Sequence, residues 1–168
     1  DVRSFHAEIA AAAKPSTRRS RIELFCEKMA VWHGEVVRTT RHEWPLKLME
    51  VCGTRRVRTL LYGENGAHAA QLRTAAGDLL RPYDRPIDDW KRDLFDGIDA
   101  GFTSTRGAIA ETGTLIIWPD ANEPRLLSLV PPLHIALLDA GQLYDTLHAA
   151  LDGVDRKSTR LNSSHLVI

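Results

Sequence analysis

Residues 107–118 read GAIAETGTLIIW and place a carboxylate, a hydroxyl and a glycine at the start of an apolar stretch. Gly113 permits a positive φ or the close approach of another backbone. Beside it, Glu111 can accept a proton or a hydrogen bond, and the Thr112 hydroxyl can donate or accept one. This grouping predicts the edge of a ligand site at the mouth of a buried strand. The alternative is an ordinary turn with a solvated glutamate, because a carboxylate becomes reactive only inside a cleft.

Two arginines stand in turns where they could hold an acid. Arg106 precedes Gly107 in a Ser-Thr-Arg-Gly turn, and Arg125 follows Pro124. A guanidinium group grips a carboxylate through two parallel hydrogen bonds. Either side chain could therefore hold a small organic acid, and a solvated surface arginine is the alternative for each.

A glycine-flanked loop, YGENG at residues 62–66, follows one predicted strand and precedes a predicted helix. Backbone amides at such a helix start can hold an anion, and Asn65 could equally cap the helix. Two glycines without a following Lys-Ser/Thr pair or a third glycine are a weak phosphate-binding signal, so a plain turn is the alternative. Further along, Asp84 and Asp88 could face a polar substrate or cap a helix.

The histidines and cysteines show no metal-binding pattern. No two of the seven histidines have metal spacing, and His134 is expected to be a hydrogen-bonded core residue rather than a base. Cys26 and Cys52 stand alone, and Cys26 lies on an apolar helix face. We therefore expect no metal site and no disulfide, and a reducing cytoplasm as the location.

Short apolar strands alternate with helices along the chain, which predicts an α/β fold with a mainly parallel sheet and helices on both faces. In such sheets, ligands bind beyond the carboxyl ends of the strands, where strand order reverses. A capping box of Ser20 and Glu23 marks the first helix. The expected strands are 35–39, 57–62, 79–83, 98–103, 114–118 and 133–138, and the further helices are 45–53, 66–76, 87–95 and 140–151.

Composition narrows the classes of partner. The chain has 168 residues, enough for one domain, and Lys+Arg and Asp+Glu both number 22. A net charge of zero argues against nucleic acid or an anionic membrane as the main partner. No apolar run reaches the length of a membrane span. Because the chain opens at Asp1 without a signal-peptide core, we expect a fragment of a longer reading frame.

The last residues differ from the rest. From Asp155 the chain reads DRKSTRLNSSHLVI, which lacks periodicity and resembles the translated read-through of a sequencing adapter. We therefore predict one domain over 1–154, incomplete at both ends, and a disordered non-native tail over 155–168. The alternative is a natural disordered tail, and both interpretations predict no packed structure there.

Residues 82–139 closely resemble the LUD-domain family, and within it the lactate utilization protein C group. Three pieces carry the resemblance: Asp99 to Thr103, the AIAETGT stretch at 108–114, and LLSLVPP at 126–132. A weaker resemblance continues from about residue 20 to about 150. It implies a three-layer α/β/α sandwich similar to the sugar-phosphate isomerase and coenzyme A transferase group, in agreement with the alternation of strands and helices.

The resemblance also implies a function: an accessory subunit in the oxidation of L-lactate to pyruvate, beside partner proteins that carry iron–sulfur clusters. The chain itself has no Cys-rich motif, so we expect no iron–sulfur cluster in it; no cofactor is assigned to this chain, and the clusters are expected in the partner proteins. On this basis the ligand-binding residues of a cleft for a small organic acid or cofactor are expected to be Asp99, Thr103, Arg106, Glu111, Thr112 and Gly113, with catalytic residues unknown.

Relatives in the family continue into a Gly-Pro-Ser-(Lys/Arg)-Thr-Ala-Asp stretch that resembles an anion-holding turn, and this chain departs from the pattern near Val154. If Glu111 faces that turn, half of the site is missing here. Two other functions stay open. One is a free-standing enzyme on a sugar phosphate or an acyl thioester, by analogy of fold alone. The other is a structural scaffold without a small-molecule site.

Overall fold

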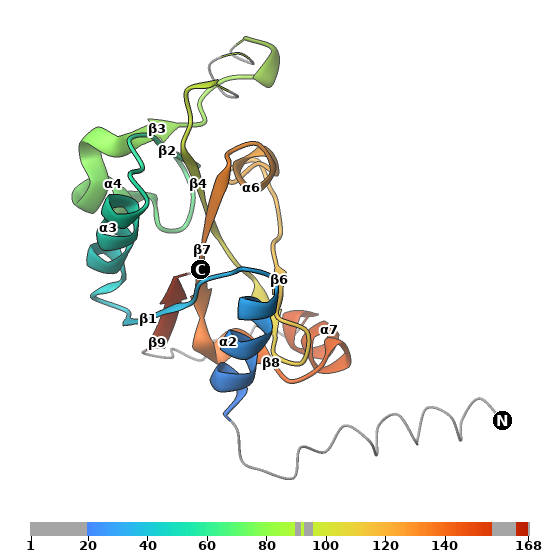
Figure 1. The fold of residues 1–168 in the computed structure, drawn as a ribbon. Helices are drawn as coiled ribbons and strands as arrows, with labels where there is room; N and C mark the ends of the chain where they lie inside the picture. The colour runs from blue at the N-terminus through green and yellow to red at the C-terminus, as the bar shows by residue number, and fades with distance from the viewer. Residues whose placement is uncertain (1–19, 90–91, 93–95, 156–163, 168) are drawn as a thin grey trace, which may run out of the picture.

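A six-stranded sheet forms the centre of the computed structural model, which describes residues 20–89, 92, 96–155 and 164–167 (Figure 1). Strands β2, β3, β4 and β7 are mutually parallel. Strand β9 runs antiparallel to both of its neighbours, so β1 points the same way as β7. In spatial order the strands are β1 (Val37–Thr40), β9 (Ser164–Val167), β7 (Leu133–Asp139), β4 (Ala100–Ser104), β2 (Leu60–Tyr62) and β3 (Leu80–Pro82).

Helices cover both faces of this sheet, which confirms the predicted three-layer α/β/α fold (Figure 1). On one face lie α3 (Trp44–Thr54) and α4 (Ala69–Ala76), where the Trp44 ring stacks on Phe102 at 5.8 Å. On the other face lies α6 (Leu126–Leu129). A Cβ atom at Gly101 would stand 1.9 Å from the carbonyl oxygen of Leu127, so only glycine lets α6 pack this closely on β4.

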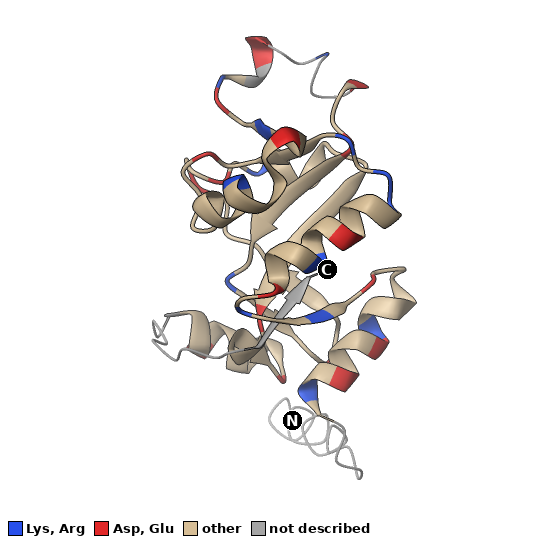
Figure 2. Cartoon of the chain, turned by 90° about the vertical axis from the view of Figure 1, so that its left-hand side faces the viewer, with Lys and Arg blue, Asp and Glu red and all other residues tan. Residues whose placement is uncertain are grey.

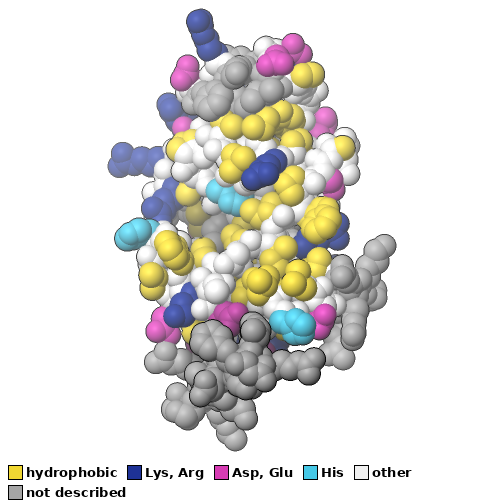
Figure 3. Space-filling model, turned by 90° about the vertical axis from the view of Figure 1, so that its right-hand side faces the viewer, with side chains coloured by type: hydrophobic (Ala, Val, Ile, Leu, Met, Phe, Trp, Pro, Cys, Tyr) yellow, Lys and Arg dark blue, Asp and Glu magenta, His cyan; other side chains and the backbone are white. Residues whose placement is uncertain are grey.

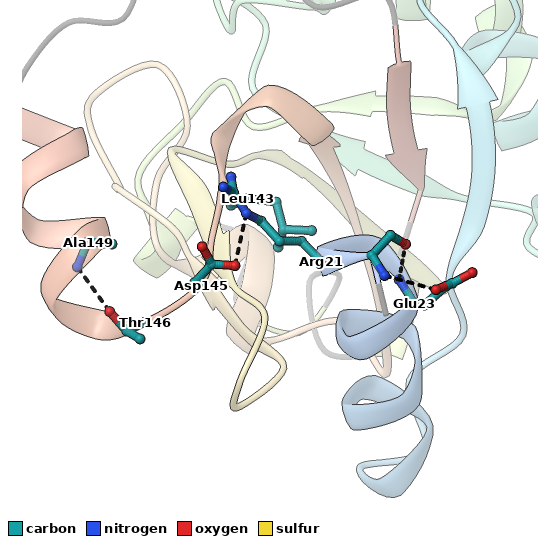
Figure 4. A network of polar contacts seen from close by, with 7 residues as sticks. Arg21, Glu23, Leu143, Asp145, Thr146 and Ala149 are labelled. Atoms are coloured by element: carbon teal, nitrogen blue, oxygen red, sulfur yellow. Dashed lines mark hydrogen bonds and ion pairs between the residues drawn. The ribbon is translucent and has the colours of Figure 1, made fainter. Parts of the chain in front are cut away.

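A smaller sheet packs below the first and holds the sequence around Glu111. Its strands are β6 (Thr114–Ile116), β5 (Gly107–Ile109) and β8 (Leu143–Tyr144). Helices α2 (Arg21–Val31) and α7 (Leu147–Asp155) pack against it. Arg21 ties α2 to the end of β8 by donating to the Leu143 carbonyl at 3.2 Å and pairing with Asp145 at 2.9 Å (Figure 4). The capping box of Ser20 and Glu23 is present as predicted.

Most predicted strands and helices are found with shifted ends, but the helix predicted over 140–151 is wrong in its first half. There the chain forms the short 3₁₀ helix η3 (Ala140–Gln142) and then β8, and α7 starts only at Leu147. The Asp139 side chain accepts a hydrogen bond from Gly141 N at 2.8 Å and closes the turn, and pairing with β5 then extends the chain. Two other 3₁₀ helices are η1 (Gly77–Leu79) and η2 (Ile87–Asp89). The rest of the predicted 87–95 helix lies mostly outside the described residues.

The prediction of no packed structure after Val154 is wrong where the structure describes this segment. Asp155 is the last residue of α7, and residues 164–167 form β9 between β1 and β7. Without that strand, the facing edges of β1 and β7 would carry unpaired backbone groups, which favours the insertion of any extended segment. Residues 156–163 and 168 lie outside the described part, and the adapter origin of the tail stays a prediction.

Two sides of the described surface differ in the kind of side chain that they expose. Basic and acidic residues are interspersed over the side that carries α3 and α4 (Figure 2). The side formed by α6 and α7 exposes apolar side chains (Figure 3), among them Leu129, Leu147 and Leu151. In the described part of the chain, the helices fall short of the length and apolar character that a membrane crossing requires.

Candidate functional site

A cavity of about 850 Å³ lies along one edge of the large sheet. Its wall includes Arg41 after β1, Ser104 and Arg106 at the end of β4, and Asp139 at the end of β7. Because β1, β4 and β7 run in the same direction, these residues all stand at carboxyl ends of strands. Open α/β sheets place their ligands at this edge.

The cavity lies at the point where strand order reverses. From β2 the chain passes through the loop 63–66 to α4 on one face and then to β3. From β4 it passes through the small sheet and α6, on the other face, to β7 on the opposite side of β4. The two outgoing connections therefore diverge, and a crevice opens between them without any special side chain being needed.

The segment 120–123 forms one wall of this crevice. A single carboxylate oxygen of Glu123 accepts hydrogen bonds from Ser104 N at 2.9 Å and from the Ser104 hydroxyl at 2.6 Å. Asp120 shapes the turn by accepting from Asn122 N at 2.7 Å and Glu123 N at 2.8 Å. The wall is thus fastened to the end of β4.

The two glycines of the YGENG loop allow this wall to approach β2. A Cβ atom at Gly63 would stand 1.9 Å from the Asn122 carbonyl oxygen, and one at Gly66 would stand 2.6 Å from Glu123 Oε1. Both glycines are therefore required for close approach rather than for a phosphate loop of known pattern. The helix predicted over 66–76 begins at Ala69 with His68 before it, so Asn65 does not cap it and instead lines the cavity.

The cationic groups of the cavity are the ones left without partners. Neither the Arg41 nor the Arg106 guanidinium makes a hydrogen bond or ion pair within the described residues, and both side chains are exposed. The three acids, Asp120, Glu123 and Asp139, each have an oxygen occupied by backbone N–H groups. An incoming anion would therefore find two available guanidinium groups in a wall that also holds three hydrogen-bonded carboxylates and several neutral polar groups.

Of the residues predicted to bind a ligand, Arg106 lines the cavity, and the Glu111-Thr112-Gly113 turn does not. Glu111 is exposed and accepts a hydrogen bond from Leu147 N, 3.3 Å away, at the start of α7. Gly113 has φ 69°, and a Cβ atom there would stand 2.9 Å from Lys28 Cβ in α2. The geometry favours the turn alternative, in which this corner docks two helices, and ligand binding by the turn stays an untested prediction.

The other two predicted ligand residues also have partners within the protein and do not line this cavity. Asp99 stands at the amino end of β4, away from the cavity, and accepts from Arg58 N at 2.7 Å and Thr59 N at 3.2 Å. Thr103 is buried, with its hydroxyl 2.8 Å from His134 Nε2. Burial lowers the pKa of His134, which favours the neutral ring, and the expectation of a hydrogen-bonded histidine is confirmed.

The remaining candidates are not among the residues that line this cavity. Asp84 pairs with the neighbouring Arg85 at 3.1 Å, and Arg125 is exposed at the start of α6. Within the described residues, no three His, Cys, Asp or Glu side chains converge as a metal site would require.

Sequence reasoning missed several cavity residues. Arg41 stands two residues after the strand predicted over 35–39, but its place at this edge depends on β9 pairing β1 into the sheet. Trp118 lines the cavity with 62% of its surface exposed. In the sequence, its apolar neighbours were the only feature that could have indicated a role for it. The other polar and aromatic residues that line the cavity are Trp44, His68, Gln71, Thr105 and Gln142.

Comparison with known proteins gives one family. The profile of the LUD domain matches residues 3–165. An uncharacterised protein of Neisseria meningitidis serogroup B is 33% identical to this chain over 136 residues. The matched region covers 79% of this chain and 58% of that protein, so the chain spans little more than half of the relative's length. A crystal structure of a DUF162 family protein from Deinococcus radiodurans superposes with a TM-score of 0.64 at 22% identity, over 84% of this chain and 82% of that one, and it supports the fold.

Proposed function

The chain belongs to the LUD domain family, and we propose that it acts in lactate utilization as an accessory subunit that binds an organic anion in the cavity at the strand ends. In this proposal it is a cytoplasmic protein of the lactate utilization protein C group. Partner subunits carry the iron–sulfur clusters and the redox chemistry, and this chain supplies the binding site.

One observation carries the binding part of the proposal. Two unpaired guanidinium groups, Arg41 and Arg106, line a polar cavity at the reversal of strand order. A carboxylate or phosphate oxygen placed between strand ends would accept charge-assisted hydrogen bonds from such groups. Charge-assisted bonds of this kind are roughly twice as strong as neutral ones, which favours an anion over a neutral ligand.

The described part of the structure does not provide the catalytic group that a free-standing enzyme on a sugar phosphate or an acyl thioester was expected to use. That function called for a desolvated Glu111 beside an anion site. The Glu111 carboxylate is instead exposed and bonded to the start of α7. The proposal therefore assigns binding rather than covalent chemistry to this chain.

Calorimetric titration of the protein with L-lactate and pyruvate tests the binding site. Removing Arg106 or Arg41 by substitution with alanine should weaken binding by about tenfold or more, since a hydrogen bond to a charged group contributes about 1.5–3 kcal/mol. Arg125→Ala is the matched control, because Arg125 is an exposed arginine outside the cavity. Glu111→Gln tests the original prediction for that residue and should leave affinity unchanged. Equal losses in the cavity and control variants would refute the site.

The accessory role needs a separate measurement. A tagged copy expressed in cells grown on lactate should retain proteins that contain iron and acid-labile sulfide. The exposed apolar side chains of α6 and α7 form a surface on which such partner proteins could pack. A purified protein that oxidises lactate by itself, without such partners, would contradict the accessory assignment.

A further inference from the structure

We propose that the ligand of this cavity is a nucleoside phosphate, held by its charge on Arg106 and Arg41 and by its ring against Trp118. This inference rests on the proposed function, because it concerns the same anion-binding cavity. It replaces the general class of organic anion by a particular one: an anion that carries a flat aromatic ring.

Size is the first argument. Pockets of about 300–1,000 Å³ hold ligands with the dimensions of a drug or cofactor. This cavity, at about 850 Å³, is near the upper end of that range. A three-carbon acid such as lactate would leave most of the volume to water, whereas a nucleotide, which is several times larger, would fill a greater share of it. The cavity is therefore larger than the proposed metabolic role alone requires.

Trp118 is the second argument. Trp118 is 62% exposed although it lines a cavity, while Trp44 of α3, which also lines the cavity, is 1% exposed and packs on Phe102. Trp44 thus serves the core, whereas most of the surface of Trp118 is left uncovered by the described residues. Bases stack on such exposed aromatic faces, with little dependence on base identity.

The neutral lining is the third argument. Asn65, Asn122 and Gln142, which carry amide side chains, line the cavity together with the arginines. An amide presents both a donor and an acceptor, which suits the mixed donor and acceptor edge of a base or the hydroxyls of a ribose. A small carboxylic acid would use few of these groups.

Four probes separate the contributions of ring and charge: AMP, adenosine, ribose 5-phosphate and L-lactate, each titrated by calorimetry into the intact protein. AMP should bind at least about tenfold more tightly than any of the other three, because only AMP offers both a ring and a phosphate. A stacked base contributes a factor of about 5 to 150 in affinity. Trp118→Ala should therefore weaken AMP binding by about fivefold or more and leave ribose 5-phosphate binding unchanged, and Trp118→Phe should restore part of the loss.

Trp32→Ala is the matched control, because Trp32 is 73% exposed at the end of α2 and lies outside the cavity. Circular dichroism and thermal unfolding confirm that each variant is folded before titration. If lactate binds as tightly as AMP, or if Trp118→Ala leaves AMP affinity unchanged, the nucleotide assignment is overturned. The anion site then stands, provided that Arg106→Ala still weakens lactate. If no probe binds in a manner sensitive to Arg106, both proposals fail.

Discussion

Glu123 holds the cavity wall to the central sheet, so its removal should loosen the protein measurably. Its Oε2 atom accepts from both the backbone N–H and the hydroxyl of Ser104, at 2.9 Å and 2.6 Å. In the Glu123→Ala variant both donors at the end of β4 lose this acceptor. Water can reach part of the vacated space, because Glu123 is only half-buried.

The size of the effect follows from the two bonds. A hydrogen bond to a charged group contributes about 1.5–3 kcal/mol, and partial exposure places each of these near the lower value. We therefore expect Glu123→Ala to lower the free energy of unfolding by about 3 kcal/mol. Glu123→Gln keeps an oxygen acceptor but loses the charge, which roughly halves the strength of each bond, so the expected loss is about 1.5 kcal/mol.

Urea unfolding followed by circular dichroism and tryptophan fluorescence measures these differences as shifts of midpoint at constant slope. Glu64→Ala is the control, since Glu64 is an exposed glutamate of the adjoining loop whose carbonyl, not its carboxylate, accepts from Arg73. It should change the unfolding free energy by less than about 0.5 kcal/mol. A loss below about 1 kcal/mol for Glu123→Ala, or equal losses for alanine and glutamine, would show that the wall is not held by this carboxylate.

Two further predictions concern the sheet. Gly101→Ala should lower the unfolding free energy by about 3 kcal/mol or more, because the new methyl group would meet the Leu127 carbonyl oxygen at 1.9 Å. The control is Gly53→Ala in α3, where the new methyl group meets nothing within 4 Å, and it should instead raise the unfolding free energy by about 0.5 kcal/mol. Thermal melts that rank the two variants the other way would contradict the packing of α6 on β4. His134 has its pKa lowered by burial, so the unfolded chain takes up the proton first and stability should fall as pH drops below about 6.5. Urea midpoints measured from pH 8 to pH 5 should fall less for His134→Gln than for the wild-type protein. The same pH dependence in both proteins would argue against a buried neutral ring at His134.

Local patterns in the sequence determined the elements and their class. The capping box at Ser20, the apolar strands and the alternation of strands with helices depend on interactions between near neighbours, and these placed the sheet, the helices on both faces and a site beyond the strand ends. Arg106 was among the predicted ligand residues and does line the cavity, because it lies in the two-residue connection between β4 and β5, which leaves the backbone little freedom.

Only the tertiary structure decided which strand ends meet. Arg41 reaches the cavity because β9, drawn from the last residues of the chain, pairs β1 with β7. Glu123 becomes a wall residue through a bond to Ser104, 19 positions earlier, and Glu111, which carries the same carboxylate, bonds to the start of α7 instead. A residue's type and spacing determine which bonds it can form, but the packing of distant segments determines which of those partners comes within reach.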